Sequence, residues 1–154
     1  MITVNRSRHI DATPADVFAA LTDPENLVGI MPRVRRVEMV ERRPDSARIV
    51  THMSFGLFGD IRTEGDVHWQ RDREVIFSAR RPLPVEARWT LTPANGGTEL
   101  QAALALDLAP LIGPLAALVP QREVANMIGP DLDAALAEIA RRVERRRERA
   151  DGGQ

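Results

Sequence analysis

Residues 9–25, HIDATPADVFAALTDPE, hold two helix starts in quick succession. Thr13 is a favourable N-cap residue, and Pro14 suits the first helical position, where a missing backbone N–H costs nothing. Asp23 and Pro24 repeat the same pair of signals. The stretch therefore predicts two short helices that are separated by little more than one capping residue.

The flanking sequence bounds these two helices. Residues 2–10 are rich in β-forming residues and partly alternate, which predicts a strand before the first helix. The helices are expected at about 14–21 and 24–30. Pro32 then ends the second one, because proline lacks the backbone N–H that the helix needs and clashes with the preceding turn.

Residues 34–108 have the pattern of strands joined by short turns. Apolar and polar side chains alternate with a period of two, which places the two kinds on opposite faces. One apolar face and one polar face are typical of an antiparallel sheet that is covered on one side. We expect strands at 34–42, 46–55, 60–70, 74–80, 85–92 and 98–107.

The alternation divides the strand side chains into an inward and an outward set. His52 and His68 fall in the outward set and are expected to decorate the exposed face, although they could form a metal or acid–base site with nearby carboxylates. A register slip of one residue would turn both toward the interior. The inward set includes Thr51, Met53, Phe55, Thr63, Trp69, Val85, Ala87, Trp89, Leu100, Ala102 and Leu104.

The last third of the chain is predicted to be helical. Residues 111–119 are small and apolar but interrupted by glycine and proline, which predicts one loose turn. From 122 to about 149, apolar residues recur every three or four positions and predict a long helix. Pro130 is expected to kink it. We expect one domain over residues 1–150 and a disordered tail at 151–154.

An antiparallel sheet with one apolar face needs a cover, and the C-terminal helix is the only element long enough. About 28 residues at about 1.5 Å each span roughly 42 Å. The sequence therefore predicts an α+β fold. In it, a seven-stranded curved antiparallel sheet wraps around the long C-terminal helix, with the two short helices between strands 1 and 2.

The chain resembles the START-like (SRPBCC) superfamily on the motif at residues 9–25, the strand order, the turn TPANGGT at 92–98 and the terminal helix. More narrowly, it is similar to the polyketide cyclase/dehydrase and lipid-transport family, which includes proteins that resemble an accessory component of carbon monoxide dehydrogenase. The resemblance implies a helix-grip fold with a cavity for a hydrophobic or amphipathic small molecule. Some relatives are aromatase/cyclases, whereas others only carry ligands.

Composition excludes several functional classes. The 154 residues contain no cysteine, which removes disulfides, thiolate nucleophiles and sulfur-ligated zinc. All 21 basic residues are arginine, which removes lysine Schiff-base chemistry. A net charge of −1 argues against a general nucleic-acid binder, and the arginine run at 141–149 suits a solvated helix end.

No apolar run reaches the roughly 18 residues of a membrane span, and the N-terminus lacks the apolar core of a signal peptide. We therefore expect a cytoplasmic protein. Asp11, Asp16 and Asp23 have no recognisable metal-ligand spacing, so neither a metal nor a cofactor is expected. The oligomeric state stays open.

The loops that a meander brings to one end of the sheet are apolar, whereas the turns at the other end are polar. The apolar connections are 29–32, 56–59, 81–84 and 108–120. One interpretation is a hydrophobic mouth that admits a water-insoluble ligand and transiently contacts a membrane or a protein. The alternative is that these loops pack on each other and close the core.

Candidate ligand contacts are inward strand residues, residues of the apolar loops and residues on the first half of the long helix. Trp69 and Trp89 could instead be core residues, and Asn126 could face solvent. Arg6 and Arg8 could reach a ligand carboxylate or carbonyl, unless the first strand is an exposed edge. The predicted contacts are Met31, Met53, Phe55, Phe58, Thr63, Trp69, Phe77, Leu83, Trp89, Leu104, Leu115, Asn126, Met127 and Pro130.

Three functions follow from this pattern. The first is a binding module that encloses a small lipid- or polyketide-like ligand without chemistry. The second is a polyketide aromatase/cyclase or dehydratase, which needs a general base and an oxyanion partner inside the cavity. The third is an accessory partner of a larger redox enzyme. Because the predicted inward faces hold no convincing base, the binding module is the leading hypothesis. Whether any titratable side chain lines the cavity would discriminate between binding and catalysis.

Overall fold

The computed structural model describes residues 2–54, 59–81 and 83–152. Strand β1 (Ile2–Ile10) leads into helices α1 (Pro14–Thr22) and α2 (Pro24–Ile30). The strands that follow are β2 (Val34–Arg42), β3 (Ser46–Ser54), β4 (Asp60–Gln70), β5 (Glu74–Ala79), β6 (Val85–Ala94) and β7 (Gly97–Leu106). The chain ends in α3 (Ala109–Ile112), the 3-10 helix η2 (Gly113–Leu118) and α4 (Gln121–Gly152).

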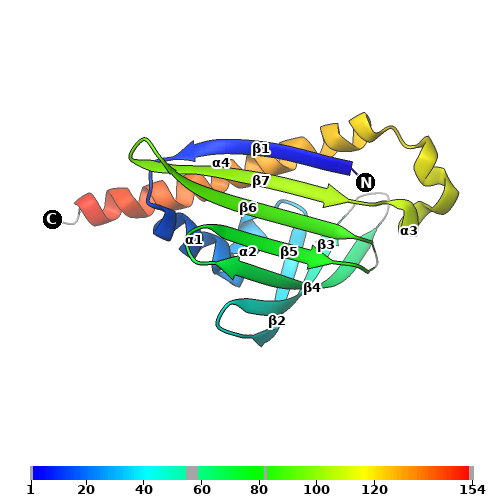
Figure 1. Cartoon of the computed structure of the whole chain (residues 1–154), viewed down its shortest axis with the longest axis horizontal. Coiled ribbons are helices and arrows are strands. Elements are labelled where there is room, and N and C mark those ends of the chain that lie inside the picture. Colours follow the sequence, from blue (N-terminus) through cyan, green and yellow to red (C-terminus); the bar gives the residue numbers. More distant parts are fainter. Residues whose placement is uncertain (1, 55–58, 82, 153–154) are drawn as a thin grey trace.

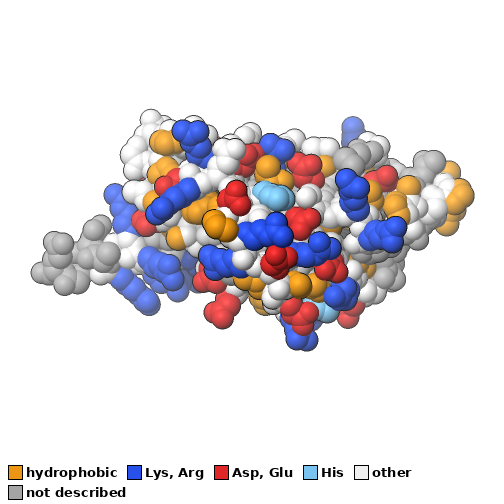
Figure 2. Space-filling model, turned by 60° about the horizontal axis from the view of Figure 1, so that its bottom comes forward, with side chains coloured by type: hydrophobic (Ala, Val, Ile, Leu, Met, Phe, Trp, Pro, Cys, Tyr) orange, Lys and Arg blue, Asp and Glu red, His pale blue; other side chains and the backbone are white. Residues whose placement is uncertain are grey.

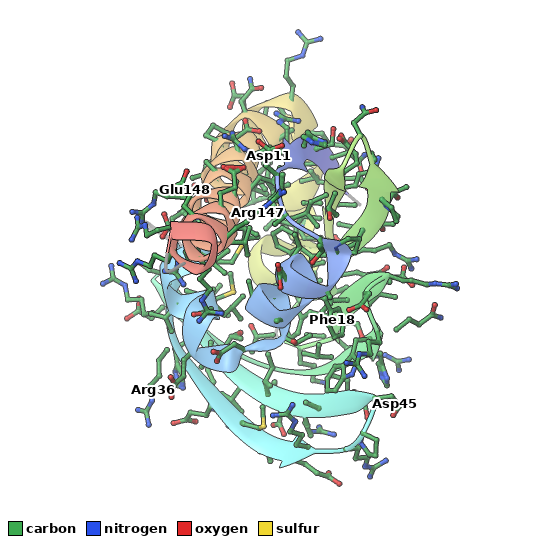
Figure 3. The ribbon with its side chains drawn as sticks, turned by 90° about the vertical axis from the view of Figure 1, so that its left-hand side faces the viewer. Asp11, Phe18, Arg36, Asp45, Arg147 and Glu148 are labelled. Carbon is green, nitrogen blue, oxygen red and sulfur yellow. The ribbon has the colours of Figure 1, made fainter. Side chains whose placement is uncertain are left out.

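The seven strands form one antiparallel sheet in the order β1-β7-β6-β5-β4-β3-β2. Figure 1 shows α4 running along one side of this sheet, and Figure 3 shows the sheet curving around the helices. This is the predicted helix-grip architecture, including the two short helices between β1 and β2. Strands β1 and β2 are the two edges of the sheet.

The two helix starts form as the capping residues predict. The hydroxyl of Thr13 accepts a hydrogen bond from the backbone N–H of Asp16 (3.2 Å). The carboxylate of Asp23 accepts one from the N–H of Glu25 (3.0 Å), so this residue ends α1 and caps α2. The resulting bend between α1 and α2 places both helices on the concave side of the sheet (Figure 3).

The strand register agrees with the predicted inward and outward sets. Thr51 faces Thr63 across β3 and β4, and Trp89 faces Ala102 across β6 and β7. His68 is exposed, and His52 lies near Glu38 on the outer face, with 3.8 Å between Nε2 and Oε2. The register has not slipped, so both histidines face away from the interior.

Ion pairs join neighbouring strands on the convex face of the sheet. Arg48 on β3 donates a hydrogen bond to Glu64 on β4 (2.8 Å). Arg88 on β6 donates to Glu74 on β5 (2.8 Å). Figure 2 shows basic and acidic side chains mixed across this side of the molecule. The convex face is therefore solvated, and the apolar side chains gather on the concave face.

Helix α4 covers the concave face with a stripe of buried residues, of which Ala135 and Ile139 are fully buried. Pro130 lies inside this helix, which continues without interruption on both sides of it. The helix extends to Gly152, beyond the predicted end, so part of the tail expected at 151–154 is helical; residues 153–154 lie outside the described part. Ahead of α4, the predicted loose turn is a short α-helix followed by a 3-10 helix.

Strand β1 is attached to α4 by Arg6. Its guanidinium lies 3.5 Å from the carboxylate of Asp133. A Cβ atom at Gly129 would overlap a terminal nitrogen of Arg6, so the missing side chain lets the guanidinium pack on the helix. Arg6 is therefore an edge-strand contact to α4 and does not line the interior cavity described below.

Candidate ligand-binding site

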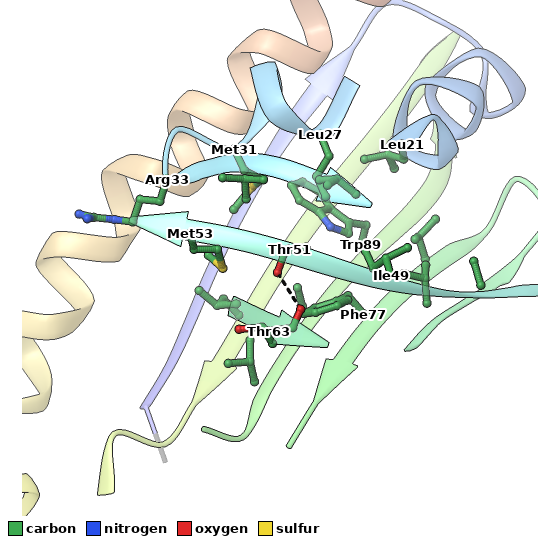
Figure 4. A pocket seen from close by; sticks show the side chains of 18 of the residues that line it. Leu21, Leu27, Met31, Arg33, Ile49, Thr51, Met53, Thr63, Phe77 and Trp89 are labelled. Carbon is green, nitrogen blue, oxygen red and sulfur yellow. Dashed lines mark hydrogen bonds between the residues drawn. The ribbon is translucent and has the colours of Figure 1, made fainter. Parts of the chain in front are cut away.

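A cavity of about 160 Å³ lies between the concave face of the sheet and the helices (Figure 4). Its walls come from the end of α1, from α2, from strands β2 to β7 and from the middle of α4. Strand β1 contributes no described lining residue. The cavity thus lies against β2 to β7 and away from β1.

The register explains why the strand walls are apolar. Inward residues recur at every second position, so that β3 presents Ile49, Thr51 and Met53 to the cavity. Trp89 and Leu104 lie opposite on β6 and β7. Most of the wall is therefore aliphatic or aromatic, which favours burial of apolar ligand surface.

Two buried threonines interrupt the apolar wall at its centre. Thr51 and Thr63 face each other on β3 and β4, and each is 3% exposed. The hydroxyl of Thr51 donates to the carbonyl oxygen of Thr63 across 3.5 Å, a long and therefore weak hydrogen bond (Figure 4). These hydroxyls lie where a polar group of a ligand could be oriented.

Gly65 on β4 determines the position of a large wall residue. A Cβ atom at this position would lie 2.6 Å from the Phe77 ring and 2.6 Å from the carbonyl oxygen of Ser78. The ring of Phe77 therefore packs directly on the β4 backbone. The absent side chain keeps this ring against the wall and out of the centre of the cavity.

Arg33 and Asp131 form an ion pair at one end of the cavity. Arg33 precedes β2, and its Nε donates a hydrogen bond to Oδ2 of Asp131 on α4. The side chains are 28% and 22% exposed, so the pair is partly shielded from water. Figure 4 shows Arg33 extending toward α4 at the end where Met31 and Met53 lie. The pair connects the edge of the sheet to the covering helix.

Several predicted ligand contacts do line the cavity. They come from the α2–β2 loop, from the strands and from the loop before β6. Leu83 in that loop is only 1% exposed. The predicted residues in the wall are Met31, Met53, Thr63, Trp69, Phe77, Leu83, Trp89 and Leu104.

The other predicted contacts lie elsewhere. Leu115 and Met127 are 60% and 44% exposed, and Asn126 and Pro130 are also exposed, so the structure places these four outside the cavity wall. On α4 it is Ile128, Asp131 and Leu132 that face the cavity. One position along a helix turns a side chain by about 100°, which separates these three from their neighbours. Phe55 and Phe58 lie outside the described residues.

Sequence reasoning missed the charged residues of the wall, which are Arg33, Asp131, Asp23 and Arg42. A helical-spacing signal was available for Asp131, because it stands three residues after Ile128 and so shares its face. No comparable signal marks Arg33, whose partner is 98 residues away in the chain.

The wall reaches the surface along β2. Its exposed members are Asp23 between α1 and α2, Pro32 in the α2–β2 loop, and Met39 and Arg42 on β2. Among the side chains described within 108–120, none lines the cavity. Leu83 of the 81–84 loop is buried and belongs to the wall, and residues 55–58 of another of these loops lie outside the described part of the chain.

Within the described residues, no cluster of three or more histidine or acidic side chains could hold a metal ion. In the same part of the chain, no helix combines the length and the apolar character needed to cross a bilayer.

The architecture is shared with several solved bacterial structures. A protein from Thermus thermophilus is 21% identical, with a TM-score of 0.78, and the match covers 92% of this chain and 96% of that one. The Zhui aromatase/cyclase from Streptomyces sp. R1128 is 16% identical (TM-score 0.74; 94% of each chain). A START superfamily protein from Mycobacterium smegmatis is 17% identical (TM-score 0.73; 94% and 99%). At these identities the likeness concerns the fold.

The sequence itself gives the more specific assignment. No curated protein matches it. A family model described as polyketide cyclase/dehydrase and lipid transport matches residues 1–144, which include every strand and most of α4. The chain belongs to the polyketide cyclase/dehydrase and lipid transport family.

Proposed function

We propose that this protein binds a small hydrophobic or amphipathic molecule in the cavity between its sheet and α4. The observation that carries the proposal is the hollow itself, which measures about 160 Å³ and has a wall made mostly of apolar side chains. Folded proteins normally fill their interiors to crystal-like density, so a void of this size needs a reason. The family to which the chain belongs supports ligand binding as that reason.

The volume bounds the size of the ligand. An engineered apolar cavity of about 150 Å³ binds benzene, whereas pockets for drug-sized ligands hold roughly 300–1,000 Å³. The cavity therefore suits one ring or a short alkyl chain. A longer lipid or a multi-ring polyketide would have to extend out of the cavity or displace α2 or the β2 edge.

The alternative is a polyketide aromatase/cyclase or dehydratase, which the similarity to the Zhui aromatase/cyclase keeps open. Such chemistry needs a base within reach of the substrate and a donor for the developing oxyanion. Two carboxylates line the cavity, and both are engaged: Asp131 binds Arg33, and Asp23 accepts a hydrogen bond from the backbone N–H of Glu25 as the cap of α2. These contacts leave both carboxylates poorly placed as a general base and favour binding without turnover.

The binding proposal is tested by filling the cavity. Ala87 on β6 lines it beside Phe77 and Leu104, so Ala87→Phe adds a ring inside the hollow. Titration calorimetry with 1-octanol should show binding to the wild type and at least a tenfold loss of affinity in the variant.

Ala103→Phe is the matched control, because Ala103 on β7 pairs with Arg88 in the outward set and lies outside the cavity wall. This variant should bind 1-octanol as the wild type does. Binding that survives Ala87→Phe unchanged, or a wild type that binds neither octanol nor another small apolar molecule, contradicts the proposal.

The apolar loops, the compartment and the domain boundary stay predictions. Transient contact with a membrane or a protein through these loops, a cytoplasmic location and a single ligand-binding domain over residues 1–150 are all compatible with the proposed role.

A further inference from the structure

We propose that Arg33 recognises a carboxylate, so that the ligand of this cavity is a small apolar molecule with one acidic end. The inference rests on the proposed binding function and adds the chemistry of the headgroup. It follows from an ion pair at one end of an otherwise apolar cavity.

The first step concerns the unused donors of Arg33. A guanidinium carries five N–H donors along two edges, and each edge can hold a carboxylate. In the described part of the chain, the one hydrogen bond formed by this side chain runs from Nε to Asp131. The side chain is 28% exposed, so part of it is in contact with solvent. The outer edge of the guanidinium can therefore receive a second carboxylate.

The second step concerns the surroundings of the pair. Arg33 is 28% exposed, so an acidic headgroup would keep contact with water and avoid the large cost of burying an unpaired charge. Met31 and Met53 lie at the same end and continue into the apolar wall (Figure 4). A ligand could thus place its acid at the rim and its apolar body among flexible methionine and aromatic side chains.

The third step distinguishes an acid from an amine. Among the described residues, no hydrogen bond reaches the second oxygen of Asp131, and a ligand ammonium could approach it. An ammonium is a compact point charge without planar complementarity, whereas a carboxylate matches the guanidinium fork with two parallel hydrogen bonds. The planar edge of Arg33 therefore favours an anionic headgroup.

The test compares three ligands that share one alkyl chain: octanoate, 1-octanol and octylamine, each titrated calorimetrically at pH 7. We expect the wild type to bind octanoate about tenfold or more tightly than octanol, since hydrogen bonds to charged groups are the stronger ones. Arg33→Gln should bring this octanoate-to-octanol ratio close to one. Asp131→Asn should preserve or increase it, because a competing carboxylate is removed.

Arg36→Gln is the matched control. Arg36 pairs with Glu38 on the outer face and is 68% exposed, so its loss should leave the ratio unchanged. If Arg33→Gln fails to fold, Arg33→Lys is tested instead. Lysine keeps the positive charge but lacks the planar pair of N–H donors, so this variant should retain only part of the preference for octanoate over octanol.

The outcomes separate this inference from the binding proposal. If octanol binds and Ala87→Phe abolishes that binding, but octanoate binds no better or octylamine binds best, only the headgroup assignment is overturned. A preference for octanoate that persists in Arg33→Gln overturns it as well. If none of the three ligands binds the wild type, both proposals fail.

Discussion

At the scale of single residues, the buried polar side chains show how much one hydroxyl can contribute. In the described part of the chain, the buried polar residues are Thr51, Thr63 and Thr98. Thr98 is fully buried at the start of β7, and its hydroxyl donates to the carbonyl oxygen of Ala12 across 2.8 Å. This hydrogen bond connects the last strand to the segment between β1 and α1.

Thr98→Val should therefore be clearly destabilising, because it leaves the Ala12 carbonyl buried without this donor. We expect the free energy of unfolding to fall by about 1–3 kcal/mol, measured by urea denaturation. Thr51→Val is the matched comparison, since the hydrogen bond of Thr51 is 3.5 Å long and the residue borders a cavity. This variant should lower the free energy of unfolding by less than Thr98→Val does. Equal losses in the two variants would contradict this account.

At the scale of elements, a charged cluster on α4 fastens α2. Glu138 accepts hydrogen bonds from Arg141 (2.9 Å) and Arg142 (2.9 Å), and Arg142 also donates to the side-chain oxygen of Asn26 (3.2 Å). A Cβ atom at Gly29 would overlap a terminal nitrogen of Arg142. The glycine thus lets the guanidinium pack against α2. The cluster connects α4 to α2, and both helices contribute to the cavity wall.

The cluster makes part of the stability depend on pH. Hydrogen bonds from Arg141 and then Arg142 lower the pKa of the Glu138 carboxyl from 4.5 to about 2. Because the folded-state pKa is the lower one, the stabilisation is complete above pH 4.5 and is lost as the pH falls toward 2.

Glu138→Gln tests this dependence. The difference in free energy of unfolding between the wild type and the variant should be constant above about pH 5 and shrink between pH 4.5 and 2, as followed by urea denaturation at each pH. The magnitude should be modest, because ion pairs near the surface contribute little. A difference that stays the same down to pH 2 would argue against a charged role for this carboxylate.

At the scale of the whole molecule, the interior has a packed part and a hollow part. Around β1, β7 and the later turns of α4, residues such as Ile10, Leu100 and Ile139 are fully buried and fill the space. The cavity lies between α2, α4 and the concave side of β2 to β7. The same helix, α4, covers both parts.

Added volume should therefore be tolerated differently in the two parts. Ala135 is fully buried on α4, and Ala135→Leu should destabilise by about 1–3 kcal/mol because the neighbours have no room to move. Ala87→Leu places the same extra carbons in the cavity and should change stability by less than about 1 kcal/mol. Thermal and urea unfolding of both variants measures this contrast, and similar losses would contradict a hollow interior.

Much of the fold follows from local patterns. Thr13 and Asp23 marked the two helix starts, and the period of two correctly divided the strand residues into faces, as the pairing of Thr51 with Thr63 shows. Strands β1, β2 and β4 have the expected boundaries, whereas β5, β6 and β7 differ from expectation by one or two residues, because strand ends depend on what they pair with. Inward parity also led to the strand residues Met53, Thr63, Trp89 and Leu104 of the cavity wall.

The rest depended on relations that no local pattern encodes. Met127 and Ile128 both fitted the apolar spacing of the long helix, and only its docking angle decided that Ile128 faces the cavity while Met127 faces out. Leu83 belongs to an apolar loop, and no local pattern shows that its side chain is buried in the cavity wall.

The amino-acid sequence by itself determined the elements, their order and which strand faces are apolar, because capping, proline placement and side-chain alternation act over a few residues. Only the tertiary structure decided that the apolar faces enclose a hollow, that part of its wall is exposed along β2, and that Arg33 meets Asp131 at its end. The physical reason is distance along the chain: sheet curvature and helix docking bring together side chains almost a hundred residues apart, and packing of the whole interior determines where space is left.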